Sequence, residues 1–320
     1  TPFQVSRIPC PPQAVLNARP YNQKITTYFP RKALLMIIDL HMHSNVSDGK
    51  LSPADLVRLV HANGVELMAL TDHDTMDGVR QASAAAEELG VGFIPGVEIS
   101  TGWGGRVVHI VGLGVDPDAP GIDAFFSSIC TKRDRRGRLI GERFEQFYGI
   151  RGAYEGALSL ADNKDNLSRT HFARWLMQEG VVKEYQEAFD RFLAEGAPAY
   201  VPGKRLNMAQ ALTLLRQCGM VPVLAHPALL SVEETALPML LQRWQSEGLM
   251  GVEVYHPAQR SRGFGSLERI ARRMGLLVTG GSDFHTTASD SHGQIGAMCA
   301  SWPNAAEDAA RLMQMINGDN

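Results

Sequence analysis

Short apolar segments alternate with longer amphipathic segments along much of the chain. The apolar segments predict β-strands at residues 34–40, 66–71, 91–99, 106–113, 221–225, 251–255 and 276–279. The amphipathic segments, in which apolar residues recur at helical spacing, predict helices at residues 53–63, 77–89, 209–218, 264–273 and 305–316. Because such alternation is typical of α/β proteins with a largely parallel sheet, we expect that class of fold.

The alternation is interrupted between residues 116 and 200. Charged helical segments at residues 122–147, 171–179 and 184–194 replace the strand-like runs there. We therefore expect a helical insertion at residues 116–200, between two parts of one α/β domain at residues 36–115 and 201–320. Residues 1–35 contain five prolines and precede Met36. We interpret them as a disordered or artificially added tail, with Met36 as the natural start.

Composition narrows the classes of function. The formal charge of -3 argues against a strongly basic nucleic-acid-binding protein, although a local basic pocket remains compatible with it. The four cysteines are far apart and form no CxxC motif, which argues against a disulfide framework and suits a reducing cytoplasm. No apolar run approaches the roughly 20 residues that span a bilayer. We expect a cytoplasmic protein with no membrane segment and no evident protein partner.

Polar side chains occur at or near the carboxyl end of nearly every predicted strand. In IIDLHMHSNVSDG, His41 and His43 occupy alternate positions, so both point to one face of the first strand. The segments SDG, TDHD, PGVEIS, VVHIVG, LAHP, EVYHP and GSDFH add further candidates, namely Asp48, His73, Glu98, His109, His226, His256, Asp283 and His285. Parallel barrels build their active sites from strand ends gathered at one face in this way.

The residue types favour a metal site. Any one of these histidines could be a core residue whose ring nitrogens are hydrogen-bonded. Burying the whole set of polar groups together is costly unless a cation binds to them. Histidine, aspartate and glutamate without cysteine suit Mn²⁺, Fe²⁺ or Zn²⁺ at a site open to water. The nine candidates other than His256 are too many for one ion, and Glu98 could bridge two. We expect two or three divalent ions per chain, with Mn²⁺ favoured. Asp39 faces the same way and either orients a histidine or serves as a structural carboxylate.

The motifs DLHMHSNVSDG, TDHDT, PGVEIS, LAHP and GSDFH resemble those of the PHP (polymerase and histidinol phosphatase) family of metal-dependent phosphoesterases. The stretches IPGVEIS, HIVGLGVD and SRTHFARWL are similar to its TrpH/YciV-like branch, which acts on nucleotide phosphates, including 3′,5′-nucleoside bisphosphates. The resemblance implies a distorted (β/α)₇ barrel with three metals. One metal would be held by His41, His43, Glu98 and Asp283, a second by Glu98, His109 and His226, and a third by Asp48, His73 and His285.

This resemblance implies hydrolysis of a phosphate ester. A hydroxide bridging the two ions that share Glu98 would attack phosphorus, with Glu98 and Asp283 as essential carboxylates. The general acid is left open between His256, which could also contact the substrate, and water. The expected reaction is removal of the 3′-phosphate from a nucleoside 3′,5′-bisphosphate.

Phosphates of the substrate beyond the reacting one require cationic partners, which the insertion offers. In TKRDRRGR, Arg135 and Arg138 share a helix face, and most arginines of this run are expected to be solvated. Arg169 and His171 follow Ser168 at a predicted helix N-terminus, where backbone N–H groups also favour anions. We expect at least one of these residues to bind phosphate, with Arg205 and Arg260 as weaker candidates.

Other functions fit parts of the pattern. A 5′→3′ exonuclease on short RNA would need stacking aromatics, for which Trp103, Tyr148, Trp175 and Phe264 are candidates. A histidinol-phosphate-type phosphatase is a further alternative, but the insertion and its basic runs argue against it. Metal-dependent amidohydrolases are another alternative class of enzyme, because they also place an HxH motif after a first strand. A non-enzymatic polymerase-associated module is disfavoured, because the set of metal ligands is complete.

Overall fold

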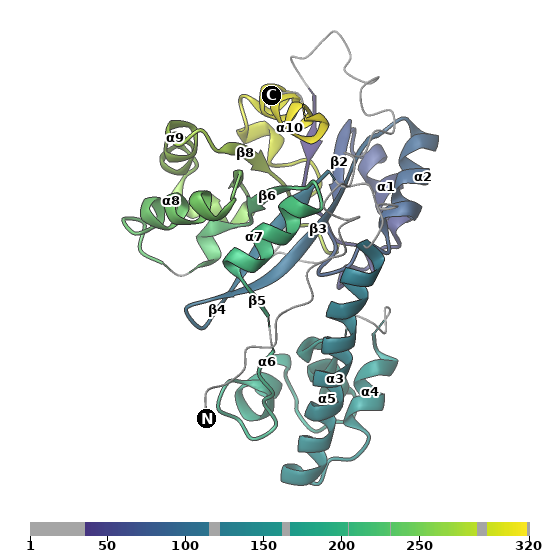
Figure 1. Ribbon diagram of the computed structural model, residues 1–320. Coiled ribbons are helices and arrows are strands. Elements are labelled where there is room, and N and C mark those ends of the chain that lie inside the picture. Colours follow the sequence, from purple (N-terminus) through teal and green to yellow (C-terminus); the bar gives the residue numbers. More distant parts are fainter. Residues whose placement is uncertain are drawn as a thin grey trace.

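The structure is a computed structural model, and it describes residues 36–114, 122–161, 167–203, 205–230, 232–286 and 293–318. The predicted tail, residues 1–35, lies outside these ranges. Within them, the strands form one sheet that curves into a nearly closed barrel, with helices on its outer surface (Figure 1). The predicted α/β class and barrel architecture are therefore confirmed.

The sheet order explains how the strand ends come together. The described strands follow the path β1-β2-β3-β4-β6-β7-β8, with β5 paired to β3. Their bounds are Ile38–Asp39 (β1), Leu67–Leu70 (β2), Gly92–Trp103 (β3), Arg106–Leu113 (β4), Leu206–Asn207 (β5), Val221–Leu224 (β6), Gly251–Tyr255 (β7) and Leu277–Gly280 (β8). Neighbours are parallel except where β4 pairs with β3 and β6. The carboxyl ends of the parallel strands therefore lie at one end of the barrel.

Of the strand predicted at residues 34–40, residues 38–39 form β1 and residues 34–35 lie outside the described ranges, and the segment that follows β1 closes the barrel. After β1, backbone N–H groups donate hydrogen bonds to the segment that begins with β8. The N–H of Leu40 donates to the carbonyl of Gly280 over 3.1 Å, and that of His43 to Phe284 over 2.9 Å. Gly281 permits this approach, because a Cβ atom there would lie 2.3 Å from Cβ of His41.

Helices connect the strands and cover the barrel. Their bounds are Pro53–Ala62 (α1), Val79–Leu89 (α2), Met208–Gln217 (α7), Leu237–Glu247 (α8), Gly265–Arg273 (α9) and Ala305–Asn317 (α10), with single turns at Pro227–Leu230 (η5), Pro257–Arg262 (η6) and Cys299–Ser301 (η7). Helix α1 begins as expected, because the Ser52 side chain accepts from the N–H of Asp55 and a proline occupies the first turn. Helix α8 was not predicted from the sequence.

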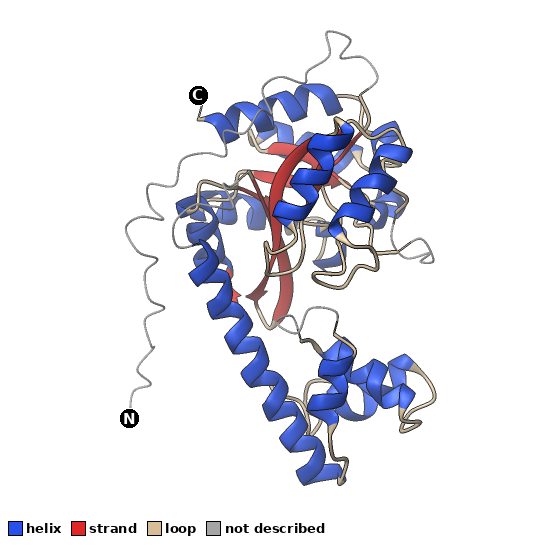
Figure 2. Cartoon of the chain, turned by 90° about the vertical axis from the view of Figure 1, so that its right-hand side faces the viewer, coloured by secondary structure: helices blue, strands red, loops and turns tan. Residues whose placement is uncertain are grey.

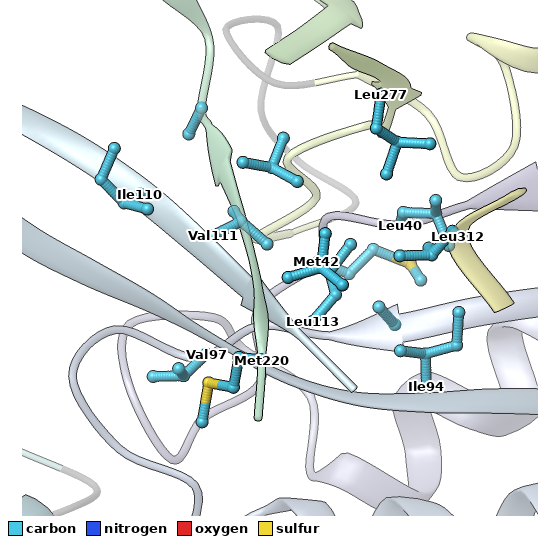
Figure 3. Packing of buried hydrophobic residues seen from close by; sticks show 14 of the residues in the cluster. Leu40, Met42, Ile94, Val97, Ile110, Val111, Leu113, Met220, Leu277 and Leu312 are labelled. Carbon is cyan, nitrogen blue, oxygen red and sulfur yellow. The ribbon is translucent and has the colours of Figure 1, made fainter. Parts of the chain in front are cut away.

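Apolar side chains from the strands and covering helices form one continuous core (Figure 3). Met42 and Ile110 are fully buried inside it. Burying a side chain of this size contributes roughly 1.5–3 kcal/mol relative to exposing it. Leu312 brings α10 against the same core, so the C-terminal helix fixes the barrel from outside. This packing holds the strands, and hence the polar groups at their ends, in fixed positions.

A separate group of helices extends from one end of the barrel (Figures 1 and 2). It is called the insertion here and comprises the described residues between 122 and 203. Its elements are Ile122–Tyr148 (α3), Ala153–Ser159 (α4), Arg169–Gln178 (α5), Tyr185–Ala188 (α6) and the π-helical turn Phe189–Leu193 (η4). The 27-residue helix α3 starts at the barrel and runs the length of the insertion. In the described part of the chain, no helix is long and apolar enough to cross a membrane.

The insertion has its own hydrophobic core. Phe144 of α3 stacks on Phe172 of α5 with ring centroids 6.2 Å apart, and it also contacts Phe192 of η4 at 5.7 Å. All three aromatic rings are buried. Since this core shares no buried residue with that of the barrel, the insertion is a second packed unit.

Candidate metal centre and adjoining cavity

The nine predicted metal ligands lie together at one end of the barrel, around Glu98 of β3. This carboxylate is fully buried. Its Oε1 lies 2.9 Å from His226 Nε2 and 3.0 Å from His109 Nδ1. Its Oε2 lies 3.1, 3.2 and 3.4 Å from ring nitrogens of His73, His43 and His41. One carboxylate thus faces five imidazoles contributed by strands far apart in the sequence.

Potential ligand atoms gather into three overlapping groups. Each group holds atoms within 4.8 Å of one another, and the groups are His41–His43–Glu98, His73–Glu98–His109 and His43–Asp48–His73–His285. The remaining two predicted ligands border these groups. Asp283 Oδ1 lies 3.2 Å from His43 Nε2, and His226 Nε2 lies 3.3 Å from His109 Nδ1. The grouping resembles the three expected metal sites, although the individual ligand roles stay predictions.

The ionisable groups of the cluster are buried close together, so they shift one another's pKa values. Burial alone would lower the pKa of His43, but Asp283 and Glu98 beside it raise that pKa to about 10. Burial would raise the pKa of Glu98, but His73 and His109 hold it well below its ordinary value. At His73 burial dominates and lowers the pKa to about 4. Glu98 is therefore ionised at neutral pH, and its buried negative charge favours a bound cation.

The donor set fits divalent metal ions. Nε2 of His41 is buried and forms no hydrogen bond within the described residues, although it lies 3.4 Å from Glu98 and 3.6 Å from Asp283. A buried nitrogen that faces two carboxylates without a hydrogen bond is costly unless it binds a further group. The nitrogen and oxygen ligands without thiolate suit Mn²⁺, Fe²⁺ or Zn²⁺.

Glu253 of β7 supports the cluster from behind and was missed in the sequence. Its Oε1 accepts a hydrogen bond from Nδ1 of His41 over 3.0 Å, and its Oε2 accepts from the backbone N–H of His226 over 2.8 Å. One buried carboxylate thereby orients two of the predicted ligands, as carboxylates behind metal-bound histidines commonly do. The available signal was a charged residue in the middle of the otherwise apolar strand GVEVY.

Two further aspartates hold the loops that carry the ligands. Asp39 accepts from the backbone N–H groups of His41, Ser282 and Gly296. These bonds hold the backbone in place, which corresponds to the structural role considered for Asp39 and not to the orientation of a histidine ring. Asp72 accepts from the N–H and hydroxyl of Ser44 and from the hydroxyl of Ser47. These bonds fix the loop that follows His43.

Backbone strain is concentrated at the same end of the barrel. Asp74, His226 and Asp283 are the described non-glycine residues with positive φ, at 54°, 29° and 53°. Such conformations are unfavourable for residues with a Cβ atom and persist where the surroundings enforce them. Each of the three follows a parallel strand directly or within a few residues, which places the strain where the chain turns to present its polar side chains.

A cavity of about 320 Å³ lies between the metal centre and the insertion. Asp48, His73 and His109 line it on the barrel side. The insertion and the segment that returns from it contribute four arginines, which are Arg133, Arg136, Arg169 and Arg205. The volume is within the range of pockets that bind small ligands. The cavity therefore joins an anionic, metal-binding side to a strongly cationic side.

The arginines of the cavity are positioned by the backbone and by one another. Nε of Arg136 donates to the carbonyl of Val201 over 2.8 Å, while its buried Nη2 has no hydrogen-bond partner among the described residues. Burial and the nearby guanidinium groups of Arg169 and Arg205 lower the pKa of Arg136 to about 10. Arg133 forms an ion pair with Asp74. Like charges held this close to one another favour binding of a polyanion.

The predicted substrate-binding residues are only partly in this cavity. Arg169 and His171 line it, and the backbone N–H of Ser168 donates to Nδ1 of His171 over 3.1 Å. Arg135 and Arg138 do not line it, because they lie on the opposite side of α3; both are exposed, and Arg138 pairs with Asp134 at 2.9 Å. On α3, the arginines that line the cavity are therefore Arg133 and Arg136, and Arg135 and Arg138 lie outside its lining.

His256 lies beside the metal centre but does not line the cavity. It is 3% exposed, and its Nε2 lies 3.3 Å from Oδ2 of Asp283. Its Nδ1 accepts from the N–H of Ala258 over 3.1 Å. This placement supports a role in holding Asp283 in position and gives no support to direct contact between His256 and the substrate.

Comparison with known proteins identifies the family. The model of the PHP domain matches residues 39–195. The chain is 39% identical to a 3′,5′-nucleoside bisphosphate phosphatase of Chromobacterium violaceum, over 78% of this chain and 87% of the relative. The chain belongs to the PHP domain family. A further PHP relative, a 5′-3′ exoribonuclease of Haemophilus influenzae, is 38% identical over 77% of this chain and 89% of its own length.

A solved structure shares this fold. An amidohydrolase of Chromobacterium violaceum, determined with bound sulfate and no metal, matches with a TM-score of 0.71 at 38% identity, over 81% of this chain and 90% of that one. The family model and the relative named as a phosphatase confirm the predictions of PHP membership and of a metal-dependent phosphoesterase. The clusters of histidine and carboxylate ligands described above are the groups of this PHP chain that can bind metal ions.

Proposed function

We propose that this PHP chain removes the 3′-phosphate from nucleoside 3′,5′-bisphosphates, using two or three divalent ions, with Mn²⁺ as the favoured metal. The observation that carries the proposal is the cavity with predicted metal ligands on one side and four arginines on the other. A substrate with two phosphates matches both sides at once. The relative named as a 3′,5′-nucleoside bisphosphate phosphatase supports the same substrate.

The residues that would hold the ions are the nine around Glu98, namely His41, His43, Asp48, His73, Glu98, His109, His226, Asp283 and His285. Divalent ions bound there would lower the pKa of water and neutralise charge on the phosphoryl oxygens. Glu98 and Asp283 supply the negative charge that retains the ions. Glu253 keeps the proton of His41 on Nδ1, which leaves Nε2 available as a ligand.

The arginines of the cavity would hold the other phosphate. A guanidinium group can hold two phosphate oxygens at once, so Arg133, Arg136, Arg169 and Arg205 together suit a dianion. His171 lines the same cavity, and its Nδ1 accepts from the N–H of Ser168. Binding energy from this phosphate would orient the reacting one.

The net reaction adds one water to phosphorus and breaks the bond between phosphorus and the 3′-oxygen of the ribose. That oxygen takes up a proton, and inorganic phosphate and a nucleoside 5′-phosphate are released. The other PHP relative favours a second candidate, 5′→3′ hydrolysis of short RNA, in which the same cavity would accept the 5′-phosphorylated end.

Phosphate release from a substrate panel tests the proposal. Protein loaded with Mn²⁺ would be assayed with adenosine 3′,5′-bisphosphate, 3′-AMP, 5′-AMP, histidinol phosphate and a 5′-phosphorylated RNA trinucleotide. We expect kcat/KM to be highest for the bisphosphate and at least 10-fold lower for 3′-AMP, which lacks the second phosphate. Equal values for the bisphosphate and 3′-AMP would contradict the role of the arginines. Faster release of nucleotides from the trinucleotide would establish the exoribonuclease instead.

A further inference from the structure

The cavity has an apolar wall that phosphate groups do not require. Phe189, Val107, Leu206, Leu167 and Ile99 line it together with the charged residues. Val107 of β4 is 42% exposed, although it is a large aliphatic residue at the edge of the site. Exposed Val107 and half-buried Phe189 and Leu206 give the cavity apolar surface beside four arginines, which suits a ligand with both a flat apolar part and anionic groups.

Phe189 is the aromatic residue of this wall. It begins the π-helical turn η4, a type of turn that occurs often at functional sites. Its ring is half-buried, and the guanidinium carbon of Arg169 lies 5.8 Å from its centroid. The same guanidinium lies 5.5 Å from the ring of Tyr200. Arg169 therefore connects the aromatic wall to the predicted phosphate site.

A second ring continues the wall toward the surface. Tyr185 of α6 lies one helical turn before Phe189, with ring centroids 5.3 Å apart, and is 39% exposed. Burial raises the pKa of its hydroxyl, which also experiences the charges of Arg174, Asp48 and Arg169. The Tyr185 ring thus contacts Phe189 and is partly open to solvent beside the cavity wall.

The aromatic residues predicted from the sequence lie elsewhere. Trp103 packs edge-on against Trp244 at 5.6 Å, and Tyr148 packs in the insertion core against Phe192. Trp175 and Phe264 are likewise absent from the cavity lining. Within the described residues, the aromatic surface available to a ligand in the cavity is therefore that of Phe189.

We propose that the nucleobase of the substrate stacks on Phe189, and that Tyr185 provides a second stacking surface for the next base of a longer substrate. This inference rests on the proposed function, because it assigns the base-binding part of the same site. Stacking on an aromatic ring accepts any base, since every base has a π-face. The site should therefore discriminate strongly by phosphate position and weakly between adenine, guanine, cytosine and uracil.

Paired substrates and matched variants test this assignment. Phe189→Leu retains apolar volume against the insertion core but removes the aromatic face. Phe147→Leu is the control, because Phe147 is a 52% exposed aromatic residue of the same insertion that does not line the cavity. Each variant would be assayed with adenosine 3′,5′-bisphosphate and with the corresponding abasic ribose 3,5-bisphosphate.

Base stacking is worth roughly 1–3 kcal/mol, so we expect Phe189→Leu to lower kcat/KM about 10-fold for adenosine 3′,5′-bisphosphate, mainly through KM. The abasic substrate should lose less than about 2-fold, and Phe147→Leu should change neither value. In calorimetric titrations of the Mn²⁺-loaded protein, Tyr185→Ala should weaken binding of the dinucleotide pApA about 5-fold more than binding of AMP. Equal losses on base-containing and abasic substrates, or no loss on either, would overturn the assignment of Phe189. An unchanged pApA affinity would overturn that of Tyr185.

Direct binding separates this inference from the proposed function. If the wild-type protein hydrolyses neither bisphosphate, the proposed function fails. Calorimetric titration of the Mn²⁺-loaded protein with AMP and with ribose 5-phosphate then still decides the base site. Wild-type protein should bind AMP about 10-fold more tightly than ribose 5-phosphate, and Phe189→Leu should abolish that difference. Equal affinities for both ligands in the wild-type protein would refute stacking on Phe189.

Discussion

Replacing Glu253 by glutamine is a sharp test of the metal centre, because it changes one atom in a buried position. Glu253 is 2% exposed and accepts two hydrogen bonds, from Nδ1 of His41 and from the backbone N–H of His226. Burial would raise its pKa, but His41 and His256 hold the pKa below its ordinary value, so the carboxylate is ionised at neutral pH. Glutamine can accept at only one end of its amide group.

The hydrogen-bond donors around residue 253 determine how the glutamine side chain would be oriented. The backbone N–H of His226 cannot change, so the amide oxygen of the Glu253→Gln variant would accept from it. The amide NH₂ would then face Nδ1 of His41, which must become an acceptor. The proton of His41 therefore moves to Nε2, the atom that faces Glu98 and Asp283 and is predicted to bind metal. A histidine protonated at that nitrogen cannot act as a ligand there.

Loss of such a supporting hydrogen bond typically lowers metal affinity 10- to 100-fold, or about 1.4–2.8 kcal/mol. Titration of metal-free protein with chelator-buffered Mn²⁺, followed by elemental analysis, would measure the change. At moderate Mn²⁺ the kcat should fall with metal occupancy, and excess Mn²⁺ should restore part of it. Glu88→Gln on α2 is the control, because Glu88 is exposed and remote from the cluster. A Glu253→Gln variant with Mn²⁺ affinity within 2-fold of wild type would refute the proposed orientation of His41.

Three further predictions address the ions, the ligands and the arginines. Elemental analysis of protein purified without chelator should show two to three transition-metal ions per chain, and one ion or none after reconstitution would contradict the trinuclear proposal. Removal of these ions should also lower the Tm, because ligands that bind only the folded state stabilise it. Glu98→Gln and Asp283→Asn should each lower kcat by several orders of magnitude while circular dichroism shows an intact fold, and near-normal turnover would exclude these residues from the centre. Arg136→Ala should lower kcat/KM for adenosine 3′,5′-bisphosphate about 10-fold or more but change that for p-nitrophenyl phosphate much less, whereas Arg135→Ala should change neither; similar losses in both variants would refute the assignment of Arg136.

The positions of the predicted metal ligands could be anticipated from the sequence because each depends on local pattern. A polar residue that ends an apolar strand must lie at one end of the barrel, and parallel strands bring such ends together. Glu253 illustrates what local pattern omits. Its role depends on hydrogen bonds to His41 and His226, which are 212 and 27 residues away in the sequence. Only the closed barrel makes these three residues neighbours.

The arginines of α3 show how strongly a sequence-based choice depends on helical phase. Leu139, which follows Arg138 directly, is 39% exposed. The inward apolar residue is Ile140, which is 2% exposed and lies one turn from Arg136. Adjacent residues on a helix point about 100° apart, so a shift of one position selects different arginines. The sequence alone could not determine the phase, because it does not show which apolar residues meet the rest of the insertion.

The cavity takes its two-sided charge from the contact between barrel and insertion. The barrel supplies the carboxylates and imidazoles, the insertion supplies arginines, and neither part contains the whole cavity. The ion pair between Asp74 and Arg133 joins them, and Asp74 directly follows His73 of the metal centre. Asp74 is itself held by the N–H of Ser100, which donates to its Oδ1 over 2.9 Å. The spacing between the two proposed phosphate sites would therefore depend on a contact that begins one residue from a predicted metal ligand.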